Sequence, residues 1–283
     1  RCGYQRRSGE RPRKKCCPYA FGTFCYLCLD TTTPNKMPIA PSPYDAIAGL
    51  YQKGWRNWYW PAAADTFTQL FFPFIPAGCK VLDLCCGCGH VSRELVRLGY
   101  QVTGLDLSSG LIEQARQEVA CPFLVGDARS FTLAEPQAAV VSTFDSLNHL
   151  LTYDDLLAAL RSVYATLLPE GVFFFDMNLE DAYLLDLGRW TVQDDAETVG
   201  LVRGAYDPLR KRACTELMWF IPEPVGGLWR RETSVVEEQC YSIEEITQAL
   251  DEAGFRVIEH WSADEAGMTS ELGYGRCFFR AIR

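Results

Sequence analysis

The chain has 283 residues, a hydrophobic fraction of 48% and a formal net charge of −9. This composition can form one substantial core, and no apolar run is long enough to span a bilayer, so we expect a soluble globular protein without a membrane partner. Residues 1–36 carry eight Lys or Arg and two acids, a net +6, which leaves −15 on residues 37–283. Such an acidic body disfavours nucleic acid as the substrate.

The first 36 residues form a basic segment without a helix or strand period. The segment contains five cysteines and is followed by Met37, after which regular patterns begin. We therefore predict a disordered or non-native extension over residues 1–36 and one folded domain over residues 37–283. A zinc site and a signal peptide are the alternatives. Both are disfavoured, because a second C-x-x-C is missing and Pro18 and Gly22 interrupt the apolar stretch.

The thirteen cysteines of the chain lack the regular spacing of a disulfide framework. Several lie in apolar runs that we expect to be core strands, and Cys85, Cys86 and Cys88 surround a glycine turn where small side chains are needed. We therefore expect reduced thiols, a cytoplasmic location and no metal site.

Residues 80–116 read KVLDLCCGCGHVSRELVRLGYQVTGLDLSSGLIEQAR, the layout of a nucleotide-binding βαβ unit. Its first strand is apolar on both faces except for Asp83 near the carboxyl end, as expected of a central parallel strand. Gly87 and Gly89 then let the backbone turn sharply and approach a ligand. The helix that starts near His90 offers unpaired N–H groups to polar ligand atoms.

The second strand of this unit, residues 101–105, ends on Asp106. Its carboxylate can accept hydrogen bonds from both hydroxyls of a ribose, which fits more than one class of cofactor. The dinucleotide fingerprint G-x-G-x-x-G has a third glycine, whereas Ser92 stands at that position here. This difference weakens a nicotinamide interpretation without removing it.

Three later segments follow this unit in the order of a known family's motifs. Residues 125–128 read VGDA, residues 139–143 form an apolar strand, and residues 144–149 read FDSLNH. With VLDLCCGCG at residues 81–89, they resemble the motifs of small-molecule class I S-adenosylmethionine-dependent methyltransferases. Cys85 stands where that family commonly has its first glycine. The resemblance covers about residues 44–283 and implies S-adenosylmethionine as cofactor, with S-adenosylhomocysteine as product.

The resemblance also implies a set of cofactor-binding residues. Asp127 stands where the family's acid takes the adenine amino group, and Phe144 stands where a ring could pack against the sulfonium. Tyr44 resembles the tyrosine of an N-terminal helix that closes over the methionine part, and Tyr59 is a weaker candidate for the same lid. The full expected set is Tyr44, Tyr59, Asp83, Cys85, Gly87, Gly89, Asp106, Leu107, Asp127, Ala128 and Phe144.

The candidate catalytic residues are His149 and Tyr44. His149 is the only histidine near the expected mouth of the site, and an imidazole can take a proton from an incoming nucleophile near neutral pH. Purely structural roles stay open: His149 as a helix cap or loop anchor, Tyr44 as a helix-packing aromatic, and Phe144 as a core residue.

The second half of the chain continues the alternation of helices and strands. Its periodicity predicts a helix over 154–168, a strand over 171–177, a helix that begins at Ser242 with a Glu245 capping box and ends at Gly254, and strands over 255–261 and 276–282. We therefore predict an α/β fold, a Rossmann-like doubly wound sheet of seven strands whose last strand is antiparallel.

An insertion over about residues 198–241 interrupts this order. It holds three strand-like runs, 201–206, 213–221 and 228–239, which are separated by turn residues. We predict a small antiparallel sheet that lies over the site and selects the substrate.

The function that follows is methyl transfer to a nitrogen, oxygen or carbon nucleophile of a small molecule. Nucleic-acid amino methylation is disfavoured, because residues 143–145 read TFD instead of the N-P-P-Y or D-P-P-Y of such enzymes. The alternatives are an NAD(P)-dependent oxidoreductase and a non-catalytic cofactor-binding module. We expect a monomer or a homodimer.

Overall fold

The computed structural model describes residues 42–45, 48, 59–185, 187–194, 198–223 and 226–283. The chain divides into two units, Arg1–Pro38 and Ile39–Arg283, and all described residues belong to the second. The basic extension predicted over residues 1–36 therefore lies outside the described residues. No helix in the described part is long and apolar enough to cross a membrane.

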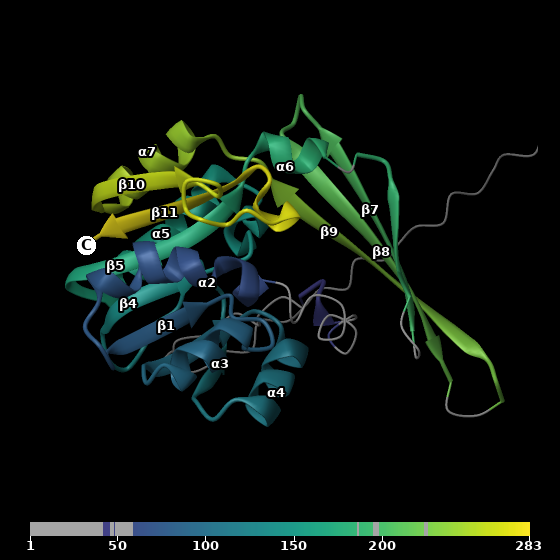
Figure 1. Cartoon of the computed structure of the whole chain (residues 1–283), viewed down its shortest axis with the longest axis horizontal. Helices are drawn as coiled ribbons and strands as arrows, with labels where there is room; N and C mark the ends of the chain where they lie inside the picture. Colours follow the sequence, from purple (N-terminus) through teal and green to yellow (C-terminus); the bar gives the residue numbers. More distant parts are fainter. Residues whose placement is uncertain (1–41, 46–47, 49–58, 186, 195–197, 224–225) are drawn as a thin grey trace, which may run out of the picture. The chain divides into compact units, whose positions relative to one another are not determined.

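A seven-stranded sheet forms the core of the second unit (Figure 1). Its strand order is β10-β11-β5-β4-β1-β2-β3, and β11 runs antiparallel to both of its neighbours, which confirms the predicted topology. The strands are β1 (Lys80–Leu84), β2 (Gln101–Asp106), β3 (Phe123–Val125), β4 (Gln137–Ser142), β5 (Leu167–Asn178), β10 (Arg256–Ser262) and β11 (Arg276–Ile282).

Helices cover both faces of this sheet because its central strands are apolar on both sides. Phe173 and Phe175 of β5 pack with α5 (Tyr153–Thr166) and α7 (Ile243–Ala253) on one face. Phe174 packs with α2 (Tyr59–Leu70) and α3 (His90–Arg97) on the other. A fifth helix, α4 (Ser109–Glu118), covers the Phe123 side chain of β3.

The helix boundaries follow local capping chemistry. The predicted capping box is present at α7, where the Ser242 hydroxyl accepts from the Glu245 N–H, and Gly254 ends the helix at φ 103°. The predicted helix over 154–168 instead spans Tyr153–Thr166, because the Thr152 hydroxyl caps its start and β5 begins at Leu167.

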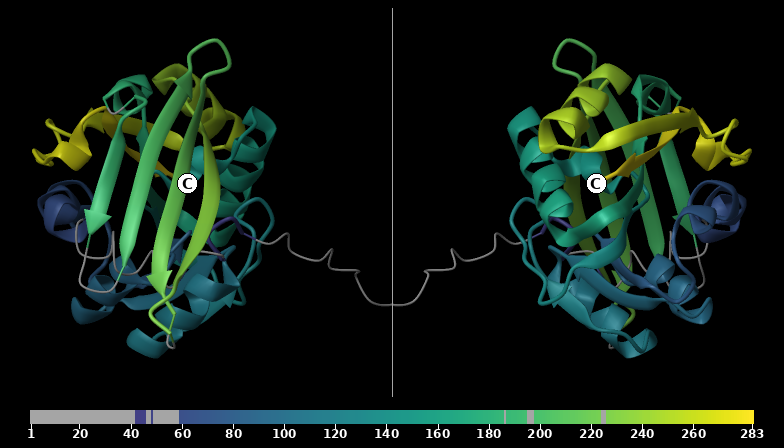
Figure 2. Two further views of the ribbon diagram at one scale, coloured as in Figure 1. Left: turned by 90° about the vertical axis from the view of Figure 1, so that its right-hand side faces the viewer. Right: turned by 90° about the vertical axis from the view of Figure 1, so that its left-hand side faces the viewer.

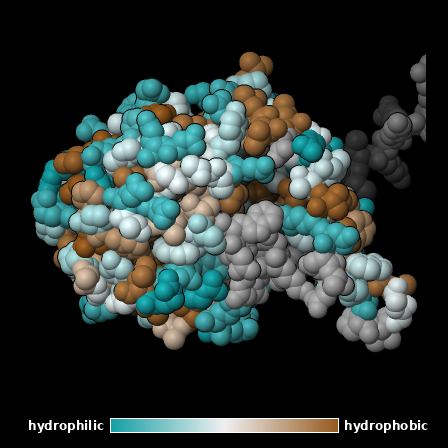
Figure 3. Space-filling view, viewed as in Figure 1, coloured by the Kyte–Doolittle hydropathy of each residue, from teal (hydrophilic) through white to brown (hydrophobic). Residues whose placement is uncertain are grey.

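A second, antiparallel sheet has the order β6-β7-β8-β9 (Figure 2). The three predicted strands are β7 (Val199–Asp207), β8 (Arg212–Pro222) and β9 (Trp229–Gln239). Its edge strand β6 (Trp190–Asp194) was not expected, because five residues, four of them exposed, give too short an alternation to stand out from a loop. The sheet therefore begins before the predicted insertion. Figure 3 shows apolar surface, in brown, on this side of the molecule. In and before β6, the side chains of Leu184, Leu185, Trp190 and Val192 are exposed.

The two sheets are joined by Asn148, which is fully buried in the short helix η3 (Ser146–His149). Its side-chain amide donates to the carbonyls of Asn178 at 3.1 Å and Gln239 at 2.9 Å, and its side-chain oxygen accepts from the Asn178 N–H at 3.0 Å. Asn148 thus fixes the end of β9 beside the ends of β4 and β5.

Candidate active site

A cavity of about 410 Å³ lies where β1, β2, β3 and β4 end. Its walls are formed by residues 42–44, the loops after these strands, Leu111 of α4, Asp155 of α5 and residues 235–237 of β9. Nine of the twelve expected site residues line it, namely Tyr44, Cys85, Gly87, Asp106, Leu107, Asp127, Ala128, Phe144 and His149. The structure therefore gathers most of the expected residues around one cavity, beneath the inserted sheet.

The glycine turn after β1 lets the backbone of this part of the cavity wall come close to a ligand. Cys85, Gly87 and Gly89 all have left-handed backbones, with φ of 59°, 54° and 81°. Gly89 does not line the cavity. It begins α3, and a Cβ there would lie 3.0 Å from the ring of Phe123, so close packing requires this glycine.

Asp106 sits at the end of β2 with its carboxylate at the glycine turn. It accepts hydrogen bonds from the backbone N–H groups of Gly87 and Ser108, each at 2.8 Å. Burial raises the pKa of Asp106, although these two hydrogen bonds oppose the shift. Each oxygen uses one acceptor site for the backbone, so each keeps a further site for a ligand hydroxyl.

Asp127 is held by a residue that the sequence did not single out. The guanidinium of Arg129 donates to both of its oxygens at 2.6–3.1 Å and also reaches Asp155 of α5 at 3.0 Å. Hydrogen bonding to Arg129 is the main reason why the pKa of Asp127 is lowered. Both Arg129 and Asp155 line the same end of the cavity.

Tyr44 and His149 form a hydrogen-bonded pair across the cavity, with Tyr44 Oη 3.0 Å from His149 Nε2. His149 Nδ1 lies 3.1 Å from the carbonyl oxygen of Glu237, which can only accept, so Nδ1 carries the hydrogen. In the neutral imidazole Nε2 is then the acceptor, and the Tyr44 hydroxyl donates to it. The pair thus presents a basic nitrogen whose orientation is fixed from both sides.

The segment that carries Tyr44 is fastened to α4 by Asp45. The Asp45 carboxylate accepts hydrogen bonds from the Ser108 hydroxyl at 2.6 Å, the Gly110 N–H at 3.2 Å and the Ser42 N–H at 3.1 Å. Burial alone would raise the pKa of Asp45, but these hydrogen bonds outweigh it and lower the pKa. Pro43 is held as well, because its carbonyl accepts from the Ser234 hydroxyl of β9.

Replacing Asp45 by asparagine is expected to loosen this segment and accelerate release of the cavity's ligand about three- to tenfold. The amide retains one acceptor oxygen where the carboxylate uses two, while the shape is kept. Stopped-flow fluorescence with S-adenosylhomocysteine gives the dissociation rate. Asp154→Asn, an exposed change in the first turn of α5, is the control. Equal rates in both variants would show that Asp45 does not hold the segment closed.

Two further expected residues, Tyr59 and Asp83, do not line the cavity. Tyr59 was expected in a lid, but it is 4% exposed in α2 and donates to the buried carboxylate of Asp176. Asp83 is 1% exposed and accepts from the Ser92 hydroxyl at 2.6 Å. The apolar surroundings of both side chains place them in the core behind the cavity wall.

The stability of the protein is expected to depend on pH through Asp83. Burial raises its pKa to about 7, although its hydrogen bonds with Ser92 oppose the shift, whereas an unfolded aspartate titrates near about 4. The folded state therefore keeps a proton that the unfolded state loses, and the free energy of unfolding falls as pH rises through this window. From pH 5 to 8 the loss is on the order of 3 kcal/mol.

Asp83→Asn lacks this ionisation, so its free energy of unfolding is expected to change less between pH 5 and pH 8 than that of the wild type. Urea unfolding at the two pH values measures the difference. Asp65→Asn, an exposed change on α2, is expected to keep the wild-type slope. An equally steep slope in Asp83→Asn would assign the pH dependence to other groups.

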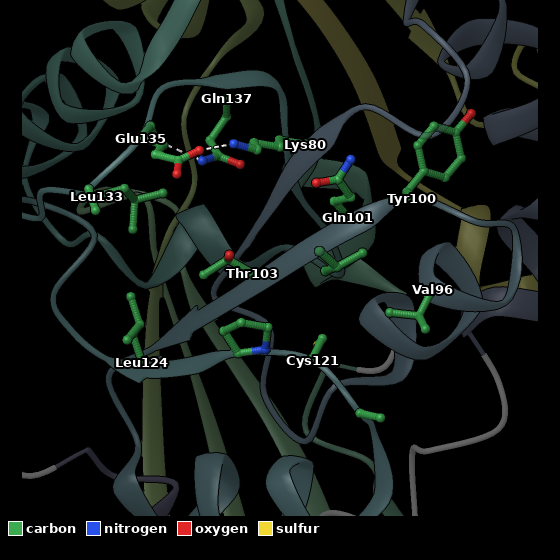
Figure 4. A pocket seen from close by; sticks show the side chains of 14 residues that line it. Lys80, Val96, Tyr100, Gln101, Thr103, Cys121, Leu124, Leu133, Glu135 and Gln137 are labelled. Carbon is green, nitrogen blue, oxygen red and sulfur yellow. Dashed lines mark hydrogen bonds and ion pairs between the residues drawn. The ribbon is translucent and has the colours of Figure 1, made fainter.

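A second depression lies at the opposite ends of the strands, near the starts of β1, β2 and β4 (Figure 4). Its lining includes the ion pair of Lys80 with Glu135, together with Tyr100, Gln101 and Cys121. None of the twelve expected site residues lines it. Among the described residues, no group of three or more His, Cys, Asp or Glu side chains is placed to hold a metal ion.

Comparisons with known proteins agree with the geometry. Residues 81–171 match the model of a methyltransferase domain. The chain is 30% identical over 246 residues to the putative methyltransferase YqeM of Bacillus subtilis (strain 168), which covers 84% of this chain and 96% of the relative. The chain belongs to the class I S-adenosylmethionine-dependent methyltransferases. The cofactor of this methyltransferase is S-adenosylmethionine, and the nicotinamide alternative is set aside.

Other similar proteins carry more specific names. The methyltransferase is 34% identical over 221 residues to dTDP-3-amino-3,6-dideoxy-alpha-D-glucopyranose N,N-dimethyltransferase of Streptomyces fradiae, which covers 75% of this chain and 84% of the relative. A crystal structure of an S-adenosylmethionine-dependent methyltransferase from Clostridium acetobutylicum ATCC 824 has the same fold, with a TM-score of 0.70 and 18% identity over 85% of this chain and 99% of the other.

Proposed function

We propose that this methyltransferase acts on a nitrogen, oxygen or carbon nucleophile of a small molecule, and that the cavity described above is its active site. The observation that carries the proposal is the Tyr44–His149 pair, which holds a basic imidazole nitrogen at the cavity that Asp106 and Phe144 also line. The name of the Streptomyces fradiae relative, an amino-sugar dimethyltransferase, supports a small acceptor. We further propose that the enzyme works in the cytoplasm, since the cysteines of the chain lack the regular spacing of a disulfide framework.

The donor set of the cavity fits S-adenosylmethionine. Asp106 keeps acceptor sites for two ribose hydroxyls, and Asp127 and Arg129 supply polar groups for the adenine end. Leu107 and Ala128 line the cavity as well and offer apolar surface to a flat base. When bound, the cofactor supplies a methyl group on a positively charged sulfur.

The residues at the other end would act on the acceptor. His149 Nε2 can take the proton that the nucleophile loses, and the Glu237 carbonyl keeps the imidazole in the required tautomer. Tyr44 can exchange its hydrogen bond with His149 for one to the acceptor. Much of the rate enhancement can come from holding the reactants in attack geometry, which is worth up to about 7–11 kcal/mol. The inserted sheet would exclude water and select the acceptor.

The experiment that tests this proposal has two steps. Calorimetry with S-adenosylmethionine and S-adenosylhomocysteine should give binding in the micromolar range for the wild-type protein. Incubation with cofactor labelled at the methyl group and whole-cell extract, followed by mass spectrometry of the small-molecule, protein and nucleic-acid fractions, should then reveal one labelled metabolite. Label found only on protein or nucleic acid would contradict a small-molecule acceptor.

A further inference from the structure

A buried charged cluster lies directly behind Phe144. It consists of Arg276, Asp145 and Asp176, with the hydroxyl of Tyr59 attached. Arg276 is 4% exposed and Asp176 is fully buried, and they lie in strands β11 and β5, whose buried side chains are mostly apolar or aromatic. A buried ion pair is often no more stabilising than apolar residues of the same volume. The cluster therefore calls for a role other than stability.

Asp176 is the centre of the cluster. Its carboxylate accepts from the backbone N–H groups of Phe144 at 3.1 Å and Asp145 at 2.6 Å, from the Arg276 guanidinium at 2.7 Å and from the Tyr59 hydroxyl. Arg276 also donates to the Asp145 carboxylate at 2.7 Å. The cluster thus holds Phe144 and Asp145, in the loop after β4, through the backbone N–H groups of both residues and the side chain of Asp145.

These two residues need such support because their backbone is strained. Phe144 has φ 61° and Asp145 has φ 52°, so two successive residues with side chains adopt the left-handed conformation. Strain of this kind persists only where the surroundings over-determine it, and it concentrates at functional sites. Burial and the charge of Asp176 raise the pKa of Tyr59, which keeps its hydroxyl available as a donor to Asp176.

The strained turn places an aromatic ring at the cavity. Phe144 lines the cavity, while its ring packs against Tyr59 with centroids 5.3 Å apart and lies 5.4 Å from the Arg276 guanidinium carbon. That guanidinium is paired with the Asp145 and Asp176 carboxylates. The face of an aromatic ring attracts a cation more strongly than a neutral group, so a ring held at the cavity favours a positively charged ligand.

We propose that Asp176, Arg276 and Tyr59 are positioning residues that hold Phe144 against the sulfonium and make the site prefer S-adenosylmethionine over its neutral product, S-adenosylhomocysteine. The inference rests on the proposed function, because it requires the cofactor to occupy this cavity with its sulfonium beside Phe144. Loss of the positive charge on methyl transfer then weakens binding and promotes exchange of product for fresh cofactor.

The test is the ratio of the two dissociation constants, Kd for S-adenosylmethionine over Kd for S-adenosylhomocysteine, measured by calorimetry on the full chain. Asp176→Asn removes one charge and one acceptor oxygen, and we expect the ratio to rise about three- to tenfold. Tyr59→Phe keeps the charge and removes only the hydroxyl, so we expect a rise of about two- to threefold. A general loss of stability would change both constants together.

Arg280→Lys is the matched control. Arg280 lies on β11, like Arg276, and is 5% exposed. It pairs with Glu259 and with the Leu70 carbonyl, away from the cavity. We expect this variant to lower the melting temperature and to leave the ratio unchanged. If Asp176→Asn and Tyr59→Phe also lower the melting temperature and leave the ratio unchanged, the cluster is only a structural element and the inference is wrong.

Two other results are decisive as well. If Asp176→Asn does not fold, Tyr59→Phe retains the buried carboxylate and decides the question by the same ratio. If the wild-type protein binds neither compound, the proposed site fails first, and this inference is overturned with it. Binding of both compounds with an unchanged ratio in the variants overturns the inference alone.

Discussion

Replacing Asp106 by alanine is expected to reduce the affinity for S-adenosylmethionine at least about 100-fold. Each hydrogen bond to a charged group is worth about 1.5–3 kcal/mol, and the carboxylate has one acceptor site on each oxygen for the two ribose hydroxyls. The loss of two such bonds therefore exceeds the 2.8 kcal/mol or so that corresponds to 100-fold. The Gly87 and Ser108 N–H groups also lose their partner, which loosens the turn. Calorimetry measures the change.

Asp127→Ala is the comparison for this result. Asp127 is already paired with Arg129, and the pair is part-exposed, so its removal is expected to weaken binding only about three- to tenfold. Circular dichroism and the melting temperature would show that both variants are folded. If Asp106→Ala bound the cofactor with wild-type affinity, the assignment of the ribose to Asp106 would be wrong.

The fold could be predicted well because its signals are local. The capping box of Ser242 with Glu245, the left-handed Gly254 and the apolar run of β5 each depend on residues a few positions apart. The order of these elements then allowed few topologies, and the antiparallel β11 beside β5 is confirmed. The edge strand β6 was missed because pairing with β7, and not its own sequence pattern, makes it a strand.

The site was predictable where one motif places several residues, and less so where contacts join distant segments. Gly87 and Asp106 belong to one βαβ unit and lie together at the cavity. Asp45 and Ser108 are 63 residues apart, and no local pattern reveals their hydrogen bond. Hydrogen bonds between segments that are distant in the sequence can be identified only from the folded structure.

Tyr59 shows how a sequence interpretation can be wrong and still indicate function. The resemblance made it a candidate for a lid, but its partner is Asp176, 117 residues away, in the core. A signal was nevertheless present, since Asp176 and Arg276 are charged residues within apolar strands. A buried charge of that kind must be paired, and two such residues near the carboxyl end of the sheet would have pointed to the cluster.

His149→Asn is expected to lower the turnover number for the acceptor about 100-fold while leaving the affinity for S-adenosylmethionine unchanged. The asparagine amide can take the place of Nδ1 and donate to the Glu237 carbonyl, so the loop after β4 keeps its anchor. What is lost is the basic Nε2, and general base catalysis contributes about 100- to 10,000-fold. Steady-state kinetics with the acceptor found by labelling, and calorimetry with the cofactor, measure the two quantities separately.

The pH profile distinguishes a base from an anchor. If His149 takes the proton, the fall of kcat/KM at acidic pH should disappear in His149→Asn, because no group remains there to be protonated. Tyr44→Phe removes the hydroxyl that donates to Nε2 but keeps the base, so it should retain that acidic limb at a lower rate. Turnover within about threefold of wild type in His149→Asn would mean that the site works by orientation alone, a mode strong enough to sustain methyl transfer without a base.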